Sequence, residues 1–159
     1  MHKIKVSLGN IDDAIRQIEE YEKKLQQNIE KFLNKLLEDG VQIAQATIME
    51  LDAVESVDLF KSMDKFLYVE ENRGIIFTDS LHACYVEFGT GVEGSNSKHP
   101  TMPWAYDTNG HGKDGWYYFD EKQGRVRYTQ GMPSRPFMYT TAKELERRLV
   151  EVAREVFSR

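Results

Sequence analysis

The longest stretch of helical periodicity in the chain covers residues 11–51. Its apolar residues recur at steps of three, four or seven: Ile11, Ile15, Ile18, Leu25, Ile29, Phe32 and Leu36. Glu, Lys and Gln fill the other face, which is typical of an amphipathic helix and not of a strand. The apolar phase continues beyond Gly40 through Ala44 and Ile48. We therefore predict one helix in which Gly40 is a tolerated weak point or a slight kink.

A helix of this length would extend roughly 60 Å. A chain of 159 residues cannot wrap so long a rod on both sides. We therefore expect part of its apolar stripe to pack on another copy of the chain.

The remaining pattern predicts short strands and one further long helix. Alternating polar and apolar residues favour a strand over residues 3–8. Residues 52–58 are predicted to form a polar link. Ser80 is a candidate N-cap for a short helix over residues 81–88. Two β-prone pairs predict hairpins, one turning at residues 72–74 and one at residues 120–124. A helix from Pro136 to the C-terminus follows from apolar residues at steps of four and three. The predicted fold class is α+β: a long N-terminal helix and a C-terminal helix packed on a small antiparallel sheet of hairpins.

A glycine-rich segment interrupts these elements. Residues 89–115 hold six glycines and two prolines and show no apolar periodicity. Such a segment inside a compact chain is usually functional or mobile. We predict a single domain over residues 1–159, with a long flexible loop at about 89–115.

The charge distribution argues against a dedicated nucleic-acid binder. The formal net charge is -5. Residues 1–55 carry 7 basic and 11 acidic side chains, whereas residues 101–159 carry 10 and 8, so no single basic patch stands out. An acidic front and a mildly basic back suit head-to-tail contact between copies. We expect neither a signal peptide nor a membrane span, because no stretch approaches the roughly 18 apolar residues of a membrane helix.

No catalytic constellation emerges from the reactive residues. Cys84 is the only cysteine, and His82 lies two positions away, where helical side chains do not face each other. We interpret Cys84 as a small buried residue of the short helix. His99 and His111 read as surface loop histidines. The histidine spacings match no zinc pattern, so we predict no catalytic, metal or cofactor site.

Aromatic and basic residues cluster between residues 104 and 128. Trp104, Trp116, Arg125 and Arg127 are candidate interface residues within this cluster. Aromatic residues and arginine mark protein interfaces, but aromatics interleaved with basic residues also stack on single-stranded nucleic acid. A nucleic-acid-associated protein therefore remains the alternative function.

Two short motifs carry a resemblance to a known family. Tyr85-Val86-Glu87-Phe88-Gly89-Thr90-Gly91 lies in the middle of the chain, and Arg135-Pro136-Phe137-Met138 opens the last helix. Leu59-Phe60-Lys61-Ser62-Met63 precedes both motifs. In this order they resemble the head–tail joining, or tail-completion (neck), proteins of long-tailed bacteriophages and prophages. The likeness spans roughly residues 11–159, although the proline and glycine that family members often carry before the leucine are missing here.

The resemblance implies a non-enzymatic virion protein, assembled in the bacterial cytoplasm, that joins or completes the tail at the head–tail junction. Its implied partners are further copies in a ring and neighbouring connector or tail proteins, with no membrane and no specific nucleic acid. The motif residues carried over are Leu59, Ser62, Tyr85, Glu87, Phe88, Gly89, Thr90, Gly91, Arg135, Pro136 and Phe137. We also predict an ion pair between Glu87 and Arg135, core positions for Phe88 and Phe137, and positive φ angles at Gly89 and Gly91.

Overall fold

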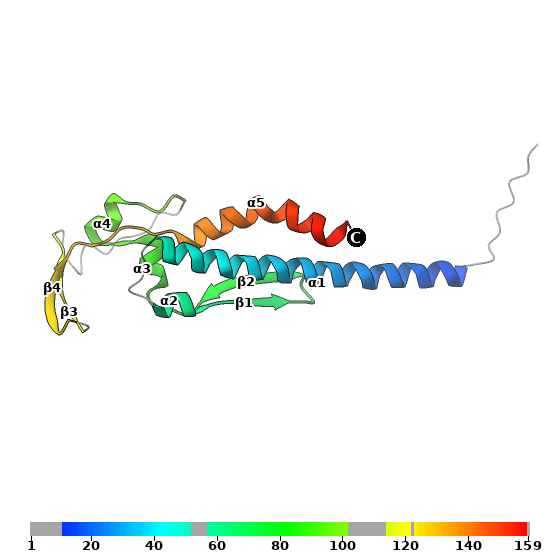
Figure 1. Cartoon of the computed structure of the whole chain (residues 1–159), viewed down its shortest axis with the longest axis horizontal. Coiled ribbons are helices and arrows are strands. Elements are labelled where there is room, and N and C mark those ends of the chain that lie inside the picture. Colours follow the sequence, from blue (N-terminus) through cyan, green and yellow to red (C-terminus); the bar gives the residue numbers. More distant parts are fainter. Residues whose placement is uncertain (1–10, 52–56, 102–113, 122, 159) are drawn as a thin grey trace, which may run out of the picture.

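The computed structural model describes residues 11–51, 57–101, 114–121 and 123–158. Helix α1, Ile11–Glu50, is the axis of the molecule. Helix α5, Phe137–Phe157, lies along one side of its C-terminal half. The hairpin of β1, Met63–Tyr68, and β2, Arg73–Thr78, lies along the other side (Figure 1). The body is therefore a stack of three layers with α1 in the middle.

Gly40 of α1 lies between the other two layers at a point of close approach. A Cβ atom added at Gly40 would lie 2.1 Å from Cδ1 of Ile76 in β2 and 3.0 Å from Cδ1 of Leu145 in α5. The absence of a side chain thus lets the strand and the second helix pack against the same turn of α1 from two sides. Gly40 was predicted as a weak point in the helix, and the structure gives it a packing role.

The hydrophobic core lies near the C-terminal end of α1. Its buried apolar residues come from five elements: Ala44, Ile48, Leu59, Met63, Ala83, Val86 and Phe137. Leu59 belongs to α2, Val57–Lys61, and Ala83 and Val86 belong to α3, Ala83–Phe88. The core thus joins all three stretches that carry the family resemblance.

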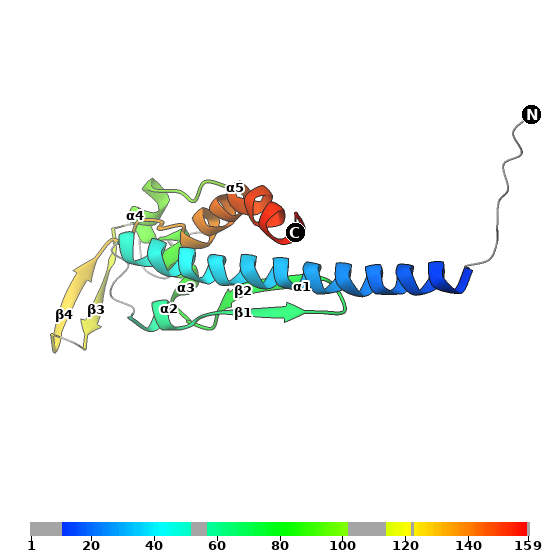
Figure 2. The same ribbon diagram turned by 45° about the vertical axis from the view of Figure 1, so that its right-hand side comes forward.

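A second hairpin lies at the end of the molecule opposite the N-terminus of α1 (Figure 2). It consists of β3, Trp116–Asp120, paired antiparallel with β4, Arg125–Thr129. The β1–β2 and β3–β4 pairs are separate two-stranded sheets. In the first hairpin Asn72 has φ +48° in the turn, a conformation that asparagine tolerates better than most residues.

The structure confirms the α+β class, both long helices and both hairpins. It corrects the prediction of a flexible loop over the whole of residues 89–115, because α4, Gly91–Asn96, forms within that segment and Gly94 is buried. The short helix begins at Ala83 with His82 at its N-cap, not at Ser80, and α2 replaces part of the expected link. The expected strand at residues 3–8 and the loop residues 102–113 lie outside the described residues.

Candidate functional site

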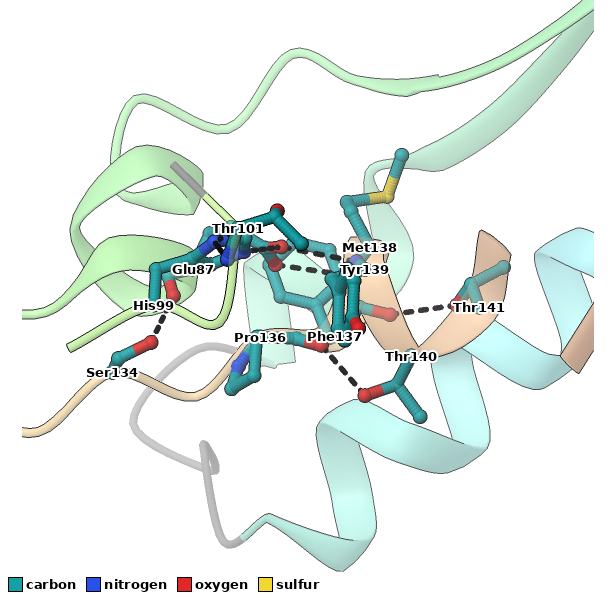
Figure 3. A network of polar contacts seen from close by, with 10 residues as sticks. All are labelled: Glu87, His99, Thr101, Ser134, Pro136, Phe137, Met138, Tyr139, Thr140 and Thr141. Atoms are coloured by element: carbon teal, nitrogen blue, oxygen red, sulfur yellow. Dashed lines mark hydrogen bonds and ion pairs between the residues drawn. The ribbon is translucent and has the colours of Figure 1, made fainter. Parts of the chain in front are cut away.

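The two motifs of the resemblance meet at the N-terminus of α5. Glu87 lies in the last turn of α3 and is only 7% exposed. Its Oε2 accepts a hydrogen bond from the backbone N–H of Met138 at 2.8 Å, and its Oε1 accepts one from the N–H of Tyr139 at 3.0 Å (Figure 3). A carboxylate at this place is favoured, because the N-terminus of a helix carries partial positive charge and unpaired N–H groups.

The carboxylate completes the first turn of α5. Pro136 is the N-cap residue and makes no side-chain cap bond. The N–H of Phe137 donates to the carbonyl of Arg135 at 2.8 Å, and that of Thr140 donates to the carbonyl of Pro136 at 3.0 Å. Because Glu87 takes the two N–H groups between them, each N–H of this first turn has an acceptor.

His99 forms the third contact of the same carboxylate. Its Nε2 lies 3.0 Å from Oε1 of Glu87, and the residue is 8% exposed. The backbone N–H of Thr101 donates to Nδ1 of His99 at 3.3 Å, so Nδ1 is an acceptor and Nε2 carries the proton that points to Glu87. The imidazole also packs against the rings of Phe88 and Tyr139, at centroid distances of 4.8 and 5.6 Å. We call Glu87, His99 and the first turn of α5 the carboxylate clasp.

The clasp corrects three expectations. Within the described residues Glu87 makes no ion pair with Arg135; instead the backbone N–H of Arg135 donates to the carbonyl of Val86 at 2.8 Å. His99 is buried and bonded and is not a surface loop histidine. Phe137 is buried as expected, whereas Phe88 is only half-buried. The sequence offered no periodic signal for His99, because it lies in a segment without regular spacing.

Backbone contacts extend the junction beyond the clasp. Thr90 Oγ1 accepts a hydrogen bond from the N–H of Met132 at 3.1 Å, and Thr90 forms an isolated β-bridge with Met132 in β5, Gly131–Met132. Gly89 and Gly91 have φ angles of +79° and +59°, as predicted. A Cβ atom on Gly89 would lie 2.7 Å from the backbone nitrogen of Ser134, so close approach also requires glycine there. Ser134, which the sequence did not single out, donates from Oγ to the carbonyl of Glu87 at 2.6 Å.

The preceding element of the resemblance is structural as well. Leu59 is fully buried in the core. Ser62 Oγ lies 2.9 Å from the carbonyl of Leu59 and 2.6 Å from Oγ1 of Thr78, so it ties the end of α2 to the end of β2. Tyr85 differs, since it is half-exposed on α3.

The candidate interface residues lie on the second hairpin, apart from Trp104, which falls outside the described residues. Arg125 and Arg127 are exposed on β4, and Arg127 pairs with Asp120 of β3 at 3.2 Å. Trp116 is half-buried at the base of β3.

The structure also places the reactive residues that the sequence analysis considered. Cys84 is exposed, so the expected buried position is wrong. In the part of the chain that the structure describes, no three His, Cys, Asp or Glu side chains gather as metal ligands do. None of the described helices is long and apolar enough to cross a membrane. Comparisons of the chain with models of protein families, with curated proteins and with solved structures found no match.

Proposed function

We propose that this chain is a non-enzymatic virion protein of a long-tailed bacteriophage or prophage. It acts at the head–tail junction, where copies assemble into a ring that joins or completes the tail. The observation that carries the proposal is the carboxylate clasp. It gives the Glu of the first motif and the helix start of the second motif one shared physical purpose, which explains why both occur together in one chain.

The shape of the molecule supports an assembly role. The N-terminal part of α1 projects beyond α5 at one end, and the β3–β4 hairpin projects at the other end (Figure 2). Both projections carry large exposed apolar side chains, among them Ile11, Ile18, Tyr117 and Phe119. Contiguous exposed apolar surface in a protein usually marks an interaction site.

Nucleic-acid association remains the second candidate, carried by the exposed aromatic residues of the hairpin. Binding of this kind combines aromatic and basic side chains, but the register of the hairpin places most of its aromatic side chains on one face and its arginines on the other. Tyr117 pairs with Tyr128 and Phe119 with Val126 on one face, whereas Arg127 pairs with Tyr118 on the other. A single-stranded nucleic acid stacked on the aromatic face would therefore lack arginine contacts from that face.

Deletion of the gene from the phage or prophage that carries it tests the proposal. We expect electron micrographs of the lysate to show separate heads and tails, and a copy of the gene supplied in trans to restore joined particles. Joined, infectious particles from the deletion alone would refute the proposal. Binding of the purified protein to single-stranded DNA at two salt concentrations tests the alternative, since phosphate contacts weaken steeply with salt.

A further inference from the structure

The apolar stripe with which α1 packs on α5 continues along α1 past the end of α5. Phe32 of α1 packs on Phe157 of α5 with ring centroids 5.8 Å apart, and Lys35 pairs with Glu155. On the opposite side of α1 the β1–β2 turn contacts the helix through a hydrogen bond from Gln26 to Asn72, at 2.9 Å. The N-terminal part of α1 extends beyond both α5 and the β1–β2 turn, and no other described element lies against it (Figure 1).

This uncovered part of α1 keeps its apolar stripe. Ile11, Ile15, Ile18 and Leu25 follow steps of four, three and seven, in phase with Phe32. With Tyr21, these side chains are between 38% and 66% exposed. The stripe is about 21 Å long at 1.5 Å per residue. A solvated helix needs no such stripe, because its outer faces are normally polar.

The β3–β4 hairpin has an uncovered apolar face of similar size. Its register places Tyr117, Phe119, Val126 and Tyr128 together on one face, and these side chains are between 49% and 74% exposed. The other face carries the Asp120–Arg127 ion pair. Strands of five residues extend about 17 Å. An isolated two-stranded hairpin is marginal in water, so this apolar face needs a covering partner.

The charges on the two surfaces disfavour contact of the stripe with a second copy of itself and leave contact with the hairpin face unopposed. Residues 11–25 carry five acidic and three basic side chains. By helical spacing Glu22 lies within the stripe, and Asp12 and Glu19 lie along one edge of it. The two arginines and the aspartate of the hairpin strands lie on its other face, so the apolar face of Tyr117, Phe119, Val126 and Tyr128 brings no charged side chain against the acidic stripe. A stripe that pairs with a second copy of itself would bring Glu22 and its acidic edge together, which is unfavourable.

We propose that copies of this chain associate head to tail, with the β3–β4 hairpin of one copy packed on the N-terminal stripe of α1 of the next copy. A helix lying on the apolar face of a small sheet is ordinary packing, and the two lengths match. Because the surfaces lie at opposite ends of an elongated molecule, the contact is heterologous and generates a ring or a filament. This deepens the proposed function by naming the contact between copies.

Two assembly-deficient variants that complement each other test the contact. Ile15→Gln with Ile18→Gln removes the stripe, and Tyr117→Thr with Phe119→Thr removes the hairpin face. Leu149→Gln with Val150→Gln is the matched control, since these α5 residues are exposed outside both surfaces. All six positions are exposed, so each variant should melt as the wild type does. We expect each test variant to weaken self-association by at least about a hundredfold, measured by sedimentation velocity, and the control to assemble normally.

Mixing the two test variants gives the decisive result. Each retains one intact surface, so together they should form a one-to-one pair that grows no further. The proposal is overturned if either variant still assembles alone, because the contact would then join like surfaces. A mixture that stays monomeric, or a wild type that stays monomeric at the highest attainable concentration, also overturns it.

Disulfide trapping provides a second readout that tolerates weak association. Chains carrying Ile15→Cys and chains carrying Tyr117→Cys, both with Cys84→Ser, are mixed under mild oxidation. Mixed dimers should exceed both homodimers, and an excess of homodimers would contradict the contact. Failure here with unjoined heads and tails in the deletion strain would leave the proposed function standing without this contact. If the contact is confirmed but the deletion strain still produces joined particles, the contact stands and the proposed function is refuted.

Discussion

Glu87→Ala should lower the stability of the fold strongly, because Glu87 accepts several hydrogen bonds at once. It removes the acceptor of two N–H groups at the start of α5, at 2.8 and 3.0 Å, and the partner of His99 Nε2 at 3.0 Å. His99 is buried beside Glu87, and the other two donors belong to partly buried residues. The loss therefore leaves donors with limited access to water without acceptors, which costs more than the loss of a solvated contact.

The expected magnitude follows from these three contacts. A hydrogen bond to a charged group contributes about 1.5–3 kcal/mol, and a donor left without an acceptor away from water costs about 1–3 kcal/mol. Because the three contacts share one carboxylate, their contributions do not add. We expect Glu87→Ala to lower the free energy of unfolding by about 3–5 kcal/mol, or the melting temperature by about 10 °C.

Chemical and thermal denaturation of purified variants measure this effect. Glu93→Ala is the matched control, because Glu93 is an exposed glutamate on the neighbouring α4. Glu87→Gln should give an intermediate loss, since its amide keeps one acceptor oxygen but turns an NH₂ group toward another donor. A loss in Glu87→Ala no larger than in Glu93→Ala would refute the clasp. A double-mutant cycle with Arg135→Ala should give additive losses of stability. Non-additive losses would instead indicate a direct ion pair between Glu87 and Arg135.

Three further predictions concern packing and charge. Phe137→Ala should cost about 3–5 kcal/mol of unfolding free energy in denaturant titrations, because Phe137 is among the most buried side chains; a loss below 1 kcal/mol would contradict its core position. Gly40→Ala should destabilise in the same assay by about 1–3 kcal/mol, since the new Cβ would lie 2.1 Å from Ile76 Cδ1; a gain in stability would mean that helix propensity prevails. Hydrogen bonds from Arg147 and Arg148 lower the pKa of Glu144 from 4.5 to about 2, so its contribution is present above pH 4.5 and is lost as the pH falls through about 2. Stability should then fall less steeply over that window in Glu144→Gln, and equal slopes would count against the pairing.

The sequence was sufficient to predict the two long helices and both hairpins, because their apolar spacing and turn residues are local information. Steps of three and four residues identified α1 and α5, and the turn at Asn72 identified the first hairpin. The glycine-rich segment had no such period, so α4 was missed. Its helix is short and depends on contacts with distant residues, such as the bond from the N–H of Glu93 to the carbonyl of Gln130 at 3.2 Å.

The candidate site could be predicted only in part, since its contacts join residues far apart in the chain. The two motifs were recognisable, and their proximity was expected, but the partner of Glu87 was not. Opposite charges suggested Arg135, whereas the structure shows that backbone N–H groups hold the carboxylate. Backbone donors are invisible in a sequence pattern, because every residue except proline carries one. The buried position of His99 was missed for a similar reason, as burial there follows from tertiary contacts alone.

Several motif residues are buried, and this determines which parts of the chain can contact a neighbour. Glu87, Phe137 and Leu59 are inside the molecule, so they specify the scaffold and cannot themselves touch a neighbour. Any contact with another copy would then come from exposed parts, and both ends of the molecule carry exposed apolar side chains. Substitutions should therefore separate into two classes. Those in the clasp lower the melting temperature, and assembly fails because the fold fails; those on the stripe or the hairpin leave the melting temperature unchanged and abolish assembly alone. A stripe variant that melts early, or a clasp variant that melts normally yet does not assemble, would break this division and place the contact between copies at the motifs themselves.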